Sequence, residues 1–193
     1  MTLIRNTWSW LKDTFLSFAA QVLLLCGRVE GARKLFLRQL QHRTENYGTS
    51  HPKTAFSMVF VAQTYTSERA VDRERQERLL TAALLIFHKS FGPVSREAAY
   101  IRHRLGFLRY KAGKLDEALS FYQEADQLYR QADTPWSLNH ADLLELWAIA
   151  LQKTGGDEFQ VSNCIREAKA IRARFHYWMS SRSRRLLLMT FRR

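Results

Sequence analysis

The fold of this chain is decided by residues 99–129, which read AYIRHRLGFLRYKAGKLDEALSFYQEADQLY. Gly113 divides the stretch into two segments, and in each segment apolar residues recur every three or four positions, as on one face of an α-helix. The apolar positions are Ala99, Ile101, Leu105, Gly106 and Tyr110, followed by Leu115, Ala118, Leu119, Tyr122, Ala125, Leu128 and Tyr129. Small residues alternate with large ones, which lets two antiparallel helices approach closely. The stretch therefore predicts a helical hairpin.

Turn residues recur along the chain with a nearly constant step. The three prolines, Pro52, Pro93 and Pro135, are 41 and 42 residues apart, and each lies in a short polar stretch. Proline suits a turn or the first position of a helix. Ser95 and Ser137 follow two of these prolines and are predicted to cap the next helix.

Glycines supply a second kind of turn. Gly113 and Gly155 are 42 residues apart and lie about midway between the proline turns. Glycine adopts the left-handed conformation that ends many helices. The chain thus alternates two turn types with helix-length segments between them, which predicts a helical repeat. No sustained two-residue alternation predicts strands.

The best hairpin resembles the tetratricopeptide repeat. The resemblance rests on Leu105-Gly106, Gly113, Ala118, Tyr122 and Ala125. The step of about 42 residues, with Gly48 and His51-Pro52 in the turn, is similar to the repeat of kinesin light chains. A second unit shows Ala62, Tyr65, Leu80, Ala83, Leu84 and Ile86, with an inner turn near residues 68–72 that is two residues longer than expected. A degenerate last unit shows Trp147, Ala148, Gly155, Ile165, Ala168 and Ile171.

Residues 29–47, with Ala32, Leu35, Phe36 and Leu40, are predicted to form the second helix of an incomplete first unit. The resemblance implies an all-α solenoid of about three units and a half over residues 29–177. Residues 1–28 are predicted to form a separate apolar helix, and residues 178–193 a basic, hydrophobic tail. The alternative to the repeat is an unrelated helical bundle, which the constant step disfavours.

The formal net charge of +12 is unevenly distributed. Residues 1–48 carry seven basic and three acidic residues, residues 49–164 carry fourteen of each, and residues 165–193 carry nine and one. Both ends are therefore basic and suit acidic protein, nucleic acid or anionic lipid. Cys26 and Cys164 form no disulfide framework or metal-ligand spacing, which fits a reducing cytoplasmic or organellar interior.

Residues 3–26 are predicted to form a strongly apolar helix. Lys12 and Asp13 interrupt it, and the part from Phe15 to Cys26 is shorter than the roughly 20 residues that span a bilayer. Residues around Cys26 fit a signal peptide or a lipoprotein box poorly. Two interpretations stay open: a helix that caps the end of the solenoid, and an interfacial helix that contacts a membrane or partner. The predicted contacts are Trp8, Trp10, Phe15 and Phe18.

The C-terminal tail mixes basic and apolar residues. Its predicted membrane or partner contacts are Arg182, Arg184, Arg185, Phe191, Arg192 and Arg193. Such a segment suits an anionic membrane surface or an acidic groove. Single-stranded RNA, stacked on Tyr177 or Trp178, is a further alternative. A disordered, solvated tail is the simplest one.

The sequence shows no catalytic constellation, and we expect neither an enzyme nor a cofactor, a metal site or a small-molecule substrate. The six histidines are scattered, and no Gly-rich phosphate loop or HExxH pair occurs. Ser137, His140 and Asp142 lie close in sequence, but their spacing is not that of a nucleophile, its base and an orienting carboxylate.

The resemblance implies that the first helices of successive hairpins line a concave binding face. The residues predicted to contact a partner there are Phe56, Phe60, Gln63, Arg102, His103, Phe107, Arg109, Asn139, Leu143 and Trp147. The lysine and asparagine clamp of chaperone-tail binders is absent, as is the helix asparagine of kinesin-light-chain repeats near Ala62 and Gly106. Three functions remain: a protein-binding scaffold or complex subunit, a peripheral membrane protein, and an RNA-associated factor.

Overall fold

The computed structural model describes the backbone of residues 2–132 and 137–190, and the side chains of residues 13–132 and 137–177. These residues form eight helices, which confirms the predicted all-α class. They are α1 (Thr2–Leu25), α2 (Val29–Tyr47), α3 (Pro52–Gln63), α4 (Ala70–Phe91), α5 (Arg96–Lys111), α6 (Leu115–Gln131), α7 (Leu138–Thr154) and α8 (Glu158–Thr190).

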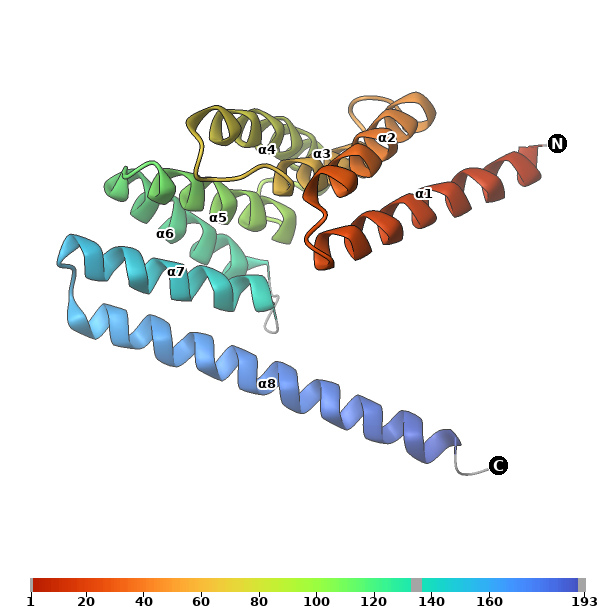
Figure 1. Ribbon diagram of the computed structural model, residues 1–193. Coiled ribbons are helices and arrows are strands. Elements are labelled where there is room, and N and C mark those ends of the chain that lie inside the picture. The colour runs from red at the N-terminus through yellow and green to blue at the C-terminus, as the bar shows by residue number, and fades with distance from the viewer. Residues whose placement is uncertain (1, 133–136, 191–193) are drawn as a thin grey trace. The chain divides into compact units, whose positions relative to one another are not determined.

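The helices pair as sequential antiparallel hairpins, α1 with α2, α3 with α4, α5 with α6 and α7 with α8 (Figure 1). The chain divides into two compact units, residues 1–93 and residues 94–193. Unit 1 holds the first two hairpins, which meet where α2 packs on α3. Unit 2 holds the other two, which meet where α6 packs on α7.

Three of the hairpins close with the same turn. After α5, Gly113 has a φ of 77° and donates its N–H to the carbonyl of Tyr110, while Lys114 donates to the carbonyl of Arg109, both at 3.0 Å. This pair of bonds satisfies helix-end carbonyls, and it requires the left-handed conformation that glycine adopts without strain. The same two bonds recur at Gly27 and Gly155. The predicted glycine turns are therefore confirmed, and Gly27 adds a further one.

The turn at Gly27 changes the prediction for the first repeat. Residues 29–47 were predicted to be the second helix of an incomplete first unit, and α1 packs on them as the first helix of a hairpin. Asp13 interrupts the apolar pattern of α1, whereas the equivalent positions before Gly113 and Gly155 are Ala99 and Ala141. The Asp13 carboxylate is nevertheless buried, and it forms an ion pair with Arg43 of α2.

Two segment lengths also differ from the regular repeat. The connection between α3 and α4 covers residues 64–69, six residues against three in residues 112–114, so the inner turn is longer, as predicted, but lies before residues 70–72, which already belong to α4. Helix α8 runs to Thr190, and in Figure 1 it extends well past the end of α7 that lies beside it. The predicted boundary between residues 177 and 178 therefore falls inside a helix.

The helix starts follow the predicted capping chemistry in part. Ser95 accepts a hydrogen bond from the N–H of Ala98 at 3.2 Å, and Pro52 occupies the first turn of α3. His51 caps α3 by accepting the N–H of Lys53 on Nδ1 at 3.1 Å, so the turn accounts for this histidine. Ser137 precedes α7 but makes no side-chain capping bond.

Arginines of α2 connect the two hairpins of unit 1. The Nε of Arg43 donates to both carboxylate oxygens of Asp13, at 2.8 and 2.9 Å, and Nη1 donates to the carbonyl of Lys53 at 3.0 Å and to Ser57 Oγ at 3.1 Å. Arg33 donates to both the carbonyl and the hydroxyl of Thr64, at the C-terminal end of α3. Charge-assisted bonds of this kind fix α1, α2 and α3 in register.

In unit 2 the close approach of α5 and α6 depends on Gly106. A Cβ atom at this position would lie 2.7 Å from Cε1 of Tyr122 and 3.1 Å from Cβ of Phe121. Tyr122 is fully buried, so its ring has little room to move. This pair supplies the small-against-large packing that the sequence predicted.

We expect Gly106→Ala to lower the free energy of unfolding by about 1 to 2 kcal/mol. Overpacking of the added Cβ against Tyr122 and Phe121 costs about 1 to 3 kcal/mol of stability. The better helix propensity of alanine offsets up to about 1 kcal/mol of this cost. Gly31→Ala is the matched control, because its Cβ would meet only the end of the Leu23 side chain, at 3.2 Å. Urea unfolding should show the control unchanged or more stable. Equal effects of the two substitutions would contradict this account of the packing.

Candidate functional site

The residues predicted to line the binding face of unit 1 serve largely as packing. Phe60 stacks on Phe36 of α2 with ring centroids 5.3 Å apart, and Phe56 lies 4.9 Å from Phe87 of α4. Both phenylalanines of α3 are half-buried, and Gln63 is exposed at the end of that helix. Unit 1 therefore presents few of its predicted contacts to a partner.

In unit 2, Arg102 and Arg109 close the α5–α6 hairpin. Arg102 pairs with Glu124 at 2.8 Å, and Arg109 pairs with Glu117 at 2.9 Å. The arginines are seven residues apart on α5, as are the glutamates on α6, so the two pairs lie in one antiparallel register. These side chains are directed to the neighbouring helix of their own hairpin.

Two of the predicted contact residues are buried, and we no longer place them on a binding face. Leu143 is fully buried in the core between α6 and α7. His103 is buried beside the rings of Tyr100 and Tyr122, and neither ring nitrogen has a hydrogen-bond partner among the described residues. Burial, together with the positive charge of Arg104 and the neighbouring His140, lowers the pKa of His103 to about 3.

Phe107 remains on the surface of α5 and is surrounded by cations. The guanidinium of Arg104 lies 5.2 Å from the centroid of its ring, and the ammonium of Lys111 lies 5.7 Å away. The ammonium of Lys153, on α7, lies 4.5 Å from the ring centroid of Tyr110. We call these five residues the basic-aromatic face of unit 2. It joins two first helices, α5 and α7, which pack on each other.

The remaining predicted residues of α7 lie apart from this face or beneath it. Asn139 is exposed near the start of α7, and Trp147 is half-buried against the cores on both sides of that helix. Arg104, Tyr110, Lys111 and Lys153 were not predicted. Arg104, Tyr110 and Lys111 lie three or four residues from Phe107 on the same helix, so helical spacing could have found them. Lys153 comes close only because α7 packs on α5.

A polar cluster, buried at Asp126 and His140, connects three helices of unit 2. Nε2 of His140 lies 2.7 Å from Oδ1 of Asp126, and Arg130 bridges Asp126 and Glu167 of α8 at 2.8 Å each. Burial alone would raise the pKa of the Asp126 carboxyl, but the hydrogen bonds from His140 and Arg130 outweigh it and lower that pKa. The cluster is thus a structural link between α6, α7 and α8.

His140 and Asp142, which lie close to Ser137 in sequence, each have other partners. His140 is paired with Asp126, while Asp142 accepts a 2.6 Å bond from Arg172 of α8. Burial raises the pKa of the Cys164 thiol and so keeps it protonated and unreactive. Among the described residues no group of three or more histidines, cysteines or carboxylates is placed to hold a metal ion.

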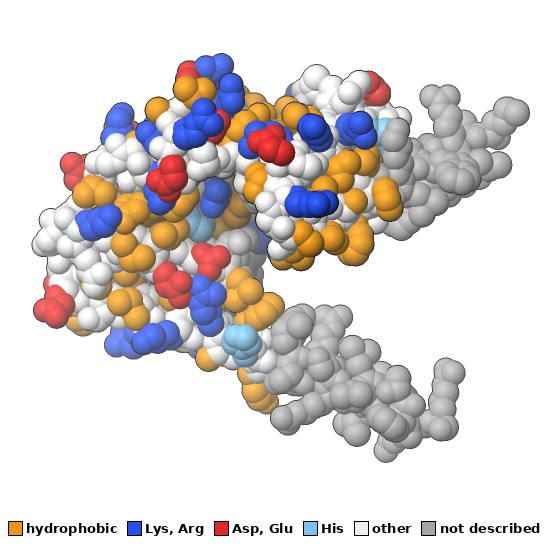
Figure 2. Space-filling view, viewed as in Figure 1, with side chains coloured by type: hydrophobic (Ala, Val, Ile, Leu, Met, Phe, Trp, Pro, Cys, Tyr) orange, Lys and Arg blue, Asp and Glu red, His pale blue; other side chains and the backbone are white. Residues whose placement is uncertain are grey.

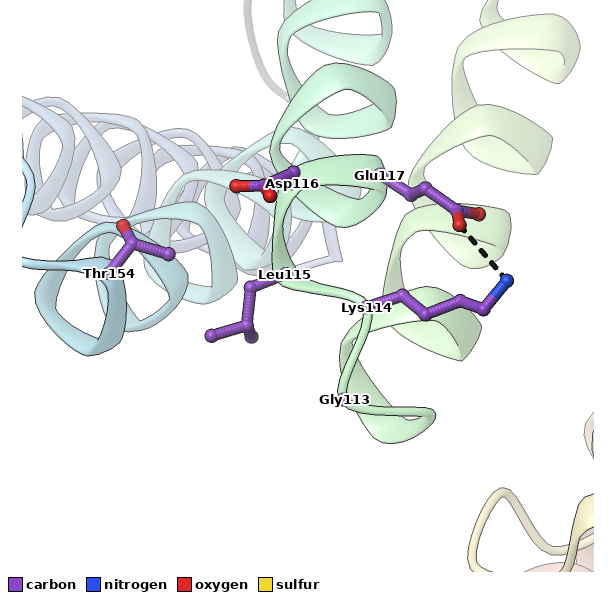
Figure 3. A pocket seen from close by; sticks show the side chains of 6 residues that line it. All are labelled: Gly113, Lys114, Leu115, Asp116, Glu117 and Thr154. Carbon is purple, nitrogen blue, oxygen red and sulfur yellow. Dashed lines mark ion pairs between the residues drawn. The ribbon is translucent and has the colours of Figure 1, made fainter.

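A shallow hollow of about 580 Å³ lies at the turn between α5 and α6 (Figure 3). Its lining comprises Gly113, Lys114, Leu115, Asp116 and Glu117, with Thr154 from the end of α7. Lys114 is engaged by Glu117 at 3.0 Å, as Figure 3 shows. The hollow is open to solvent and offers no buried polar group to orient a small molecule.

The predicted contacts at the two ends are only partly described. Phe15 and Phe18 are exposed on α1, whereas the side chains of Trp8, Trp10, Arg182, Arg184 and Arg185 lie outside the described residues, as do Phe191, Arg192 and Arg193 altogether. In the part of the chain that the structure describes, no helix combines the length and the apolar character needed to cross a bilayer.

The fold is similar to that of two solved repeat proteins. BtubC (BKLC) from P. vanneervenii matches with a TM-score of 0.67 and 22% identity, over 85% of this chain and 64% of that one. A putative kinesin light chain of Podospora anserina, with nearly identical TPR-like repeats, matches with a TM-score of 0.59 and 16% identity, over 84% of this chain and 75% of that one. No protein-family model and no curated protein sequence matches the chain.

These likenesses confirm the predicted fold, a tetratricopeptide-like repeat of the kind found in kinesin-light-chain-like proteins. The chain spans about two thirds of the length of BtubC, at 64%. At such low identity the comparison establishes the fold alone. Tetratricopeptide-like repeats are typically protein-interaction modules and are generally not catalytic.

Proposed function

We propose that this protein is a non-catalytic scaffold, adaptor or complex subunit that binds a partner protein through the basic-aromatic face of unit 2. The proposal rests on the surroundings of the Arg104 and Lys153 side chains. Neither has a carboxylate partner among the described residues, and both lie over partly exposed aromatic rings. Other cations of unit 2, such as Arg102, Arg130 and Arg172, are already engaged by carboxylates.

The arrangement suits an extended, acidic segment of a partner protein. Carboxylates of such a segment would pair with Arg104 and Lys153, and its apolar side chains would cover Phe107 and Tyr110. Aromatic and arginine side chains are the residues that contribute most to protein interfaces. Because both cations are held against rings, little side-chain entropy remains to be lost on binding.

A short fluorescein-labelled peptide of alternating glutamate and leucine is a suitable probe. We expect Phe107→Ala combined with Lys153→Ala to weaken its binding at least about tenfold, since loss of an interface hot spot costs more than about 1 kcal/mol. Lys169→Ala, an exposed lysine of α8, is the matched control and should bind as the unaltered protein does. Fluorescence anisotropy measures all three dissociation constants.

The salt response and a neutral probe complete the test. Binding should weaken between low and physiological ionic strength, because the cations are solvent-accessible. A peptide with glutamine in place of glutamate should bind poorly. If the double variant and the control bound the acidic peptide equally well, the basic-aromatic face would not be the binding site.

A further inference from the structure

The side of α8 that is turned away from α7 carries basic and aromatic residues. The residues of α8 that pack on α7 are Val161, Cys164, Ala168 and Ile171. Helical spacing places a second set on the opposite side, on or beside a line whose members are seven or four residues apart. We call this set the outer face of α8; it comprises Phe159, Arg166, Lys169, Ala173 and Tyr177.

The two cations of the outer face have no carboxylate partner among the described residues. Arg166 donates to the amide oxygen of Asn163 at 2.6 Å, and Lys169 is exposed. Arg172, by contrast, is directed to α7, where Asp142 and Glu145 engage it. Figure 2 shows Lys and Arg side chains along the edge of unit 2 where Figure 1 places the described part of α8. The outer face therefore offers positive charge to a partner.

The excess of positive charge continues along α8. Residues 165–193 contain nine basic residues and one acidic residue, Glu167, whose carboxylate is engaged by Arg130 of α6 at 2.8 Å. The helix continues to Thr190, so the basic residues up to that point follow one another on a single rod. A row of cations of this length complements a polymer that has a negative charge on every unit, as the phosphate backbone of a nucleic acid has.

The two aromatic rings favour a single strand over a duplex. Phe159 and Tyr177 are 74% and 77% exposed, and their 18-residue separation corresponds to about 27 Å along the helix. The rings of Phe107 and Tyr110, in the basic-aromatic face, are instead partly exposed and lie against cations. An exposed ring can stack on an unpaired base, whereas a duplex keeps its bases stacked inside.

The order of residues on the outer face disfavours a lipid bilayer. A helix that lies in a membrane interface buries a continuous apolar side and keeps its cations on the polar side. On α8, Arg166 lies on the same line as the two rings. Only small apolar residues, Ala170 and Ala173, lie between Arg166 and Tyr177 on this side. The face therefore lacks the continuous apolar stripe that insertion into a bilayer requires.

We propose that the outer face of α8 binds single-stranded RNA. Arg166 and Lys169 pair with phosphates of the strand, while Phe159 and Tyr177 stack on unpaired bases. RNA is the nucleic acid whose single-stranded loops and ends proteins most often recognise. The surface lies on a different helix from the basic-aromatic face, so it goes beyond the proposed protein-binding function and does not depend on it.

The probe is a fluorescein-labelled oligouridylate of about 12 nucleotides, a length within the range that single-strand-binding folds cover. We expect Phe159→Ala with Tyr177→Ala to weaken its binding to the full chain at least about tenfold, because both stacking rings are lost. Phe15→Ala is the matched control, since Phe15 is a 69% exposed phenylalanine of α1. Fluorescence anisotropy gives the dissociation constants, and circular dichroism checks that the variants keep their helices.

The salt response separates phosphate contacts from general attraction to a basic protein. Each phosphate contact contributes about 0.7 to the slope of log K against log salt concentration for a single strand. Arg166→Ala with Lys169→Ala should therefore lower that slope by about 1.4. Lys34→Ala with Arg38→Ala is the matched control, because it removes the same charge from exposed positions of α2 and should leave the slope unchanged.

Four results would overturn the proposal. The first is no binding of the oligouridylate, or equal binding by the unaltered protein and the Phe159/Tyr177 variant. The second is an equal slope in the two charge variants. The third is tighter binding of duplex RNA or of the deoxy oligomer. The fourth is cosedimentation with phosphatidylserine vesicles that the Phe159/Tyr177 variant loses. The Phe107/Lys153 variant should bind the oligouridylate normally, so the two proposals fail separately.

Discussion

Acidification from pH 7 to pH 4 is expected to cost the unaltered protein about 3 kcal/mol of unfolding free energy through His103 alone. The side chain titrates near its ordinary pKa of 6.5 when unfolded but near 3 when buried in unit 2. Below pH 6.5 the unfolded chain therefore binds a proton that the folded chain does not. The contribution of His103 to the free energy of unfolding is complete above pH 6.5. It falls progressively toward pH 3, by about 1.4 kcal/mol per pH unit in the middle of that range.

The variant His103→Leu should remove most of this dependence. Leucine fills a similar space, needs no hydrogen bond and cannot bind a proton, so we also expect it to raise the stability at pH 7. Urea unfolding followed by circular dichroism at several pH values gives the comparison. His176→Gln, at an exposed histidine of α8, is the control and should keep the slope of the unaltered protein. An unchanged slope in His103→Leu would contradict the assignment.

Asp126 adds to acid sensitivity at lower pH. Its folded pKa is depressed, so its contribution is present above the ordinary aspartate range and is lost as the pH falls through the folded value. The histidine and aspartate effects thus have the same sign, and the aspartate effect begins at a lower pH. The His103→Leu variant should still lose the stability that Asp126 contributes as the pH falls through the lower range.

Removing Arg43 is expected to destabilise unit 1 by about 3 to 5 kcal/mol. The Arg43 and Asp13 side chains are only 12% and 9% exposed, so Arg43→Ala leaves a buried carboxylate without its partner. The same substitution removes the bonds to the carbonyl of Lys53 and the hydroxyl of Ser57 on α3. Helix α1 should lose its packing on α2, which urea unfolding and proteolysis near the turn at Gly27 would report.

A double substitution separates the ion pair from simple loss of packing. Asp13→Leu with Arg43→Met should recover much of the stability, because no unpaired charge remains. Arg78→Ala is the control, since Arg78 and Glu74 form an exposed pair on α4 and such pairs contribute about 0 to 1 kcal/mol. An Arg43→Ala effect as small as that of Arg78→Ala would show that the buried pair does not hold α1 in place.

The helical repeat could be predicted from sequence because its signals are local. Glycine turns, proline turns and the apolar spacing of residues 99–129 each reflect constraints within a few residues. The pairing of α1 with α2 could not be recognised in the same way. Asp13 looks like an interruption of an apolar helix until Arg43, 30 residues later, is seen to neutralise it.

The candidate binding face remains a prediction. Phe107 is partly exposed on α5, but helical spacing did not distinguish it from Arg102 and Arg109, which pair with glutamates of α6. Burial of His103 and Leu143 likewise depends on neighbouring helices. The position of Lys153 over Tyr110 is a tertiary contact with no local sequence signal.

The central claim, that a partner protein lies on the basic-aromatic face of unit 2, is tested most directly by photo-crosslinking. Benzoylphenylalanine in place of Phe107 keeps an aromatic side chain at the centre of the face, and the same group in place of Tyr177 serves as an exposed site on α8. With the labelled acidic peptide, we predict crosslinking from position 107 and little from position 177. Equal crosslinking at the two positions, or crosslinking from position 177 alone, would contradict the claim.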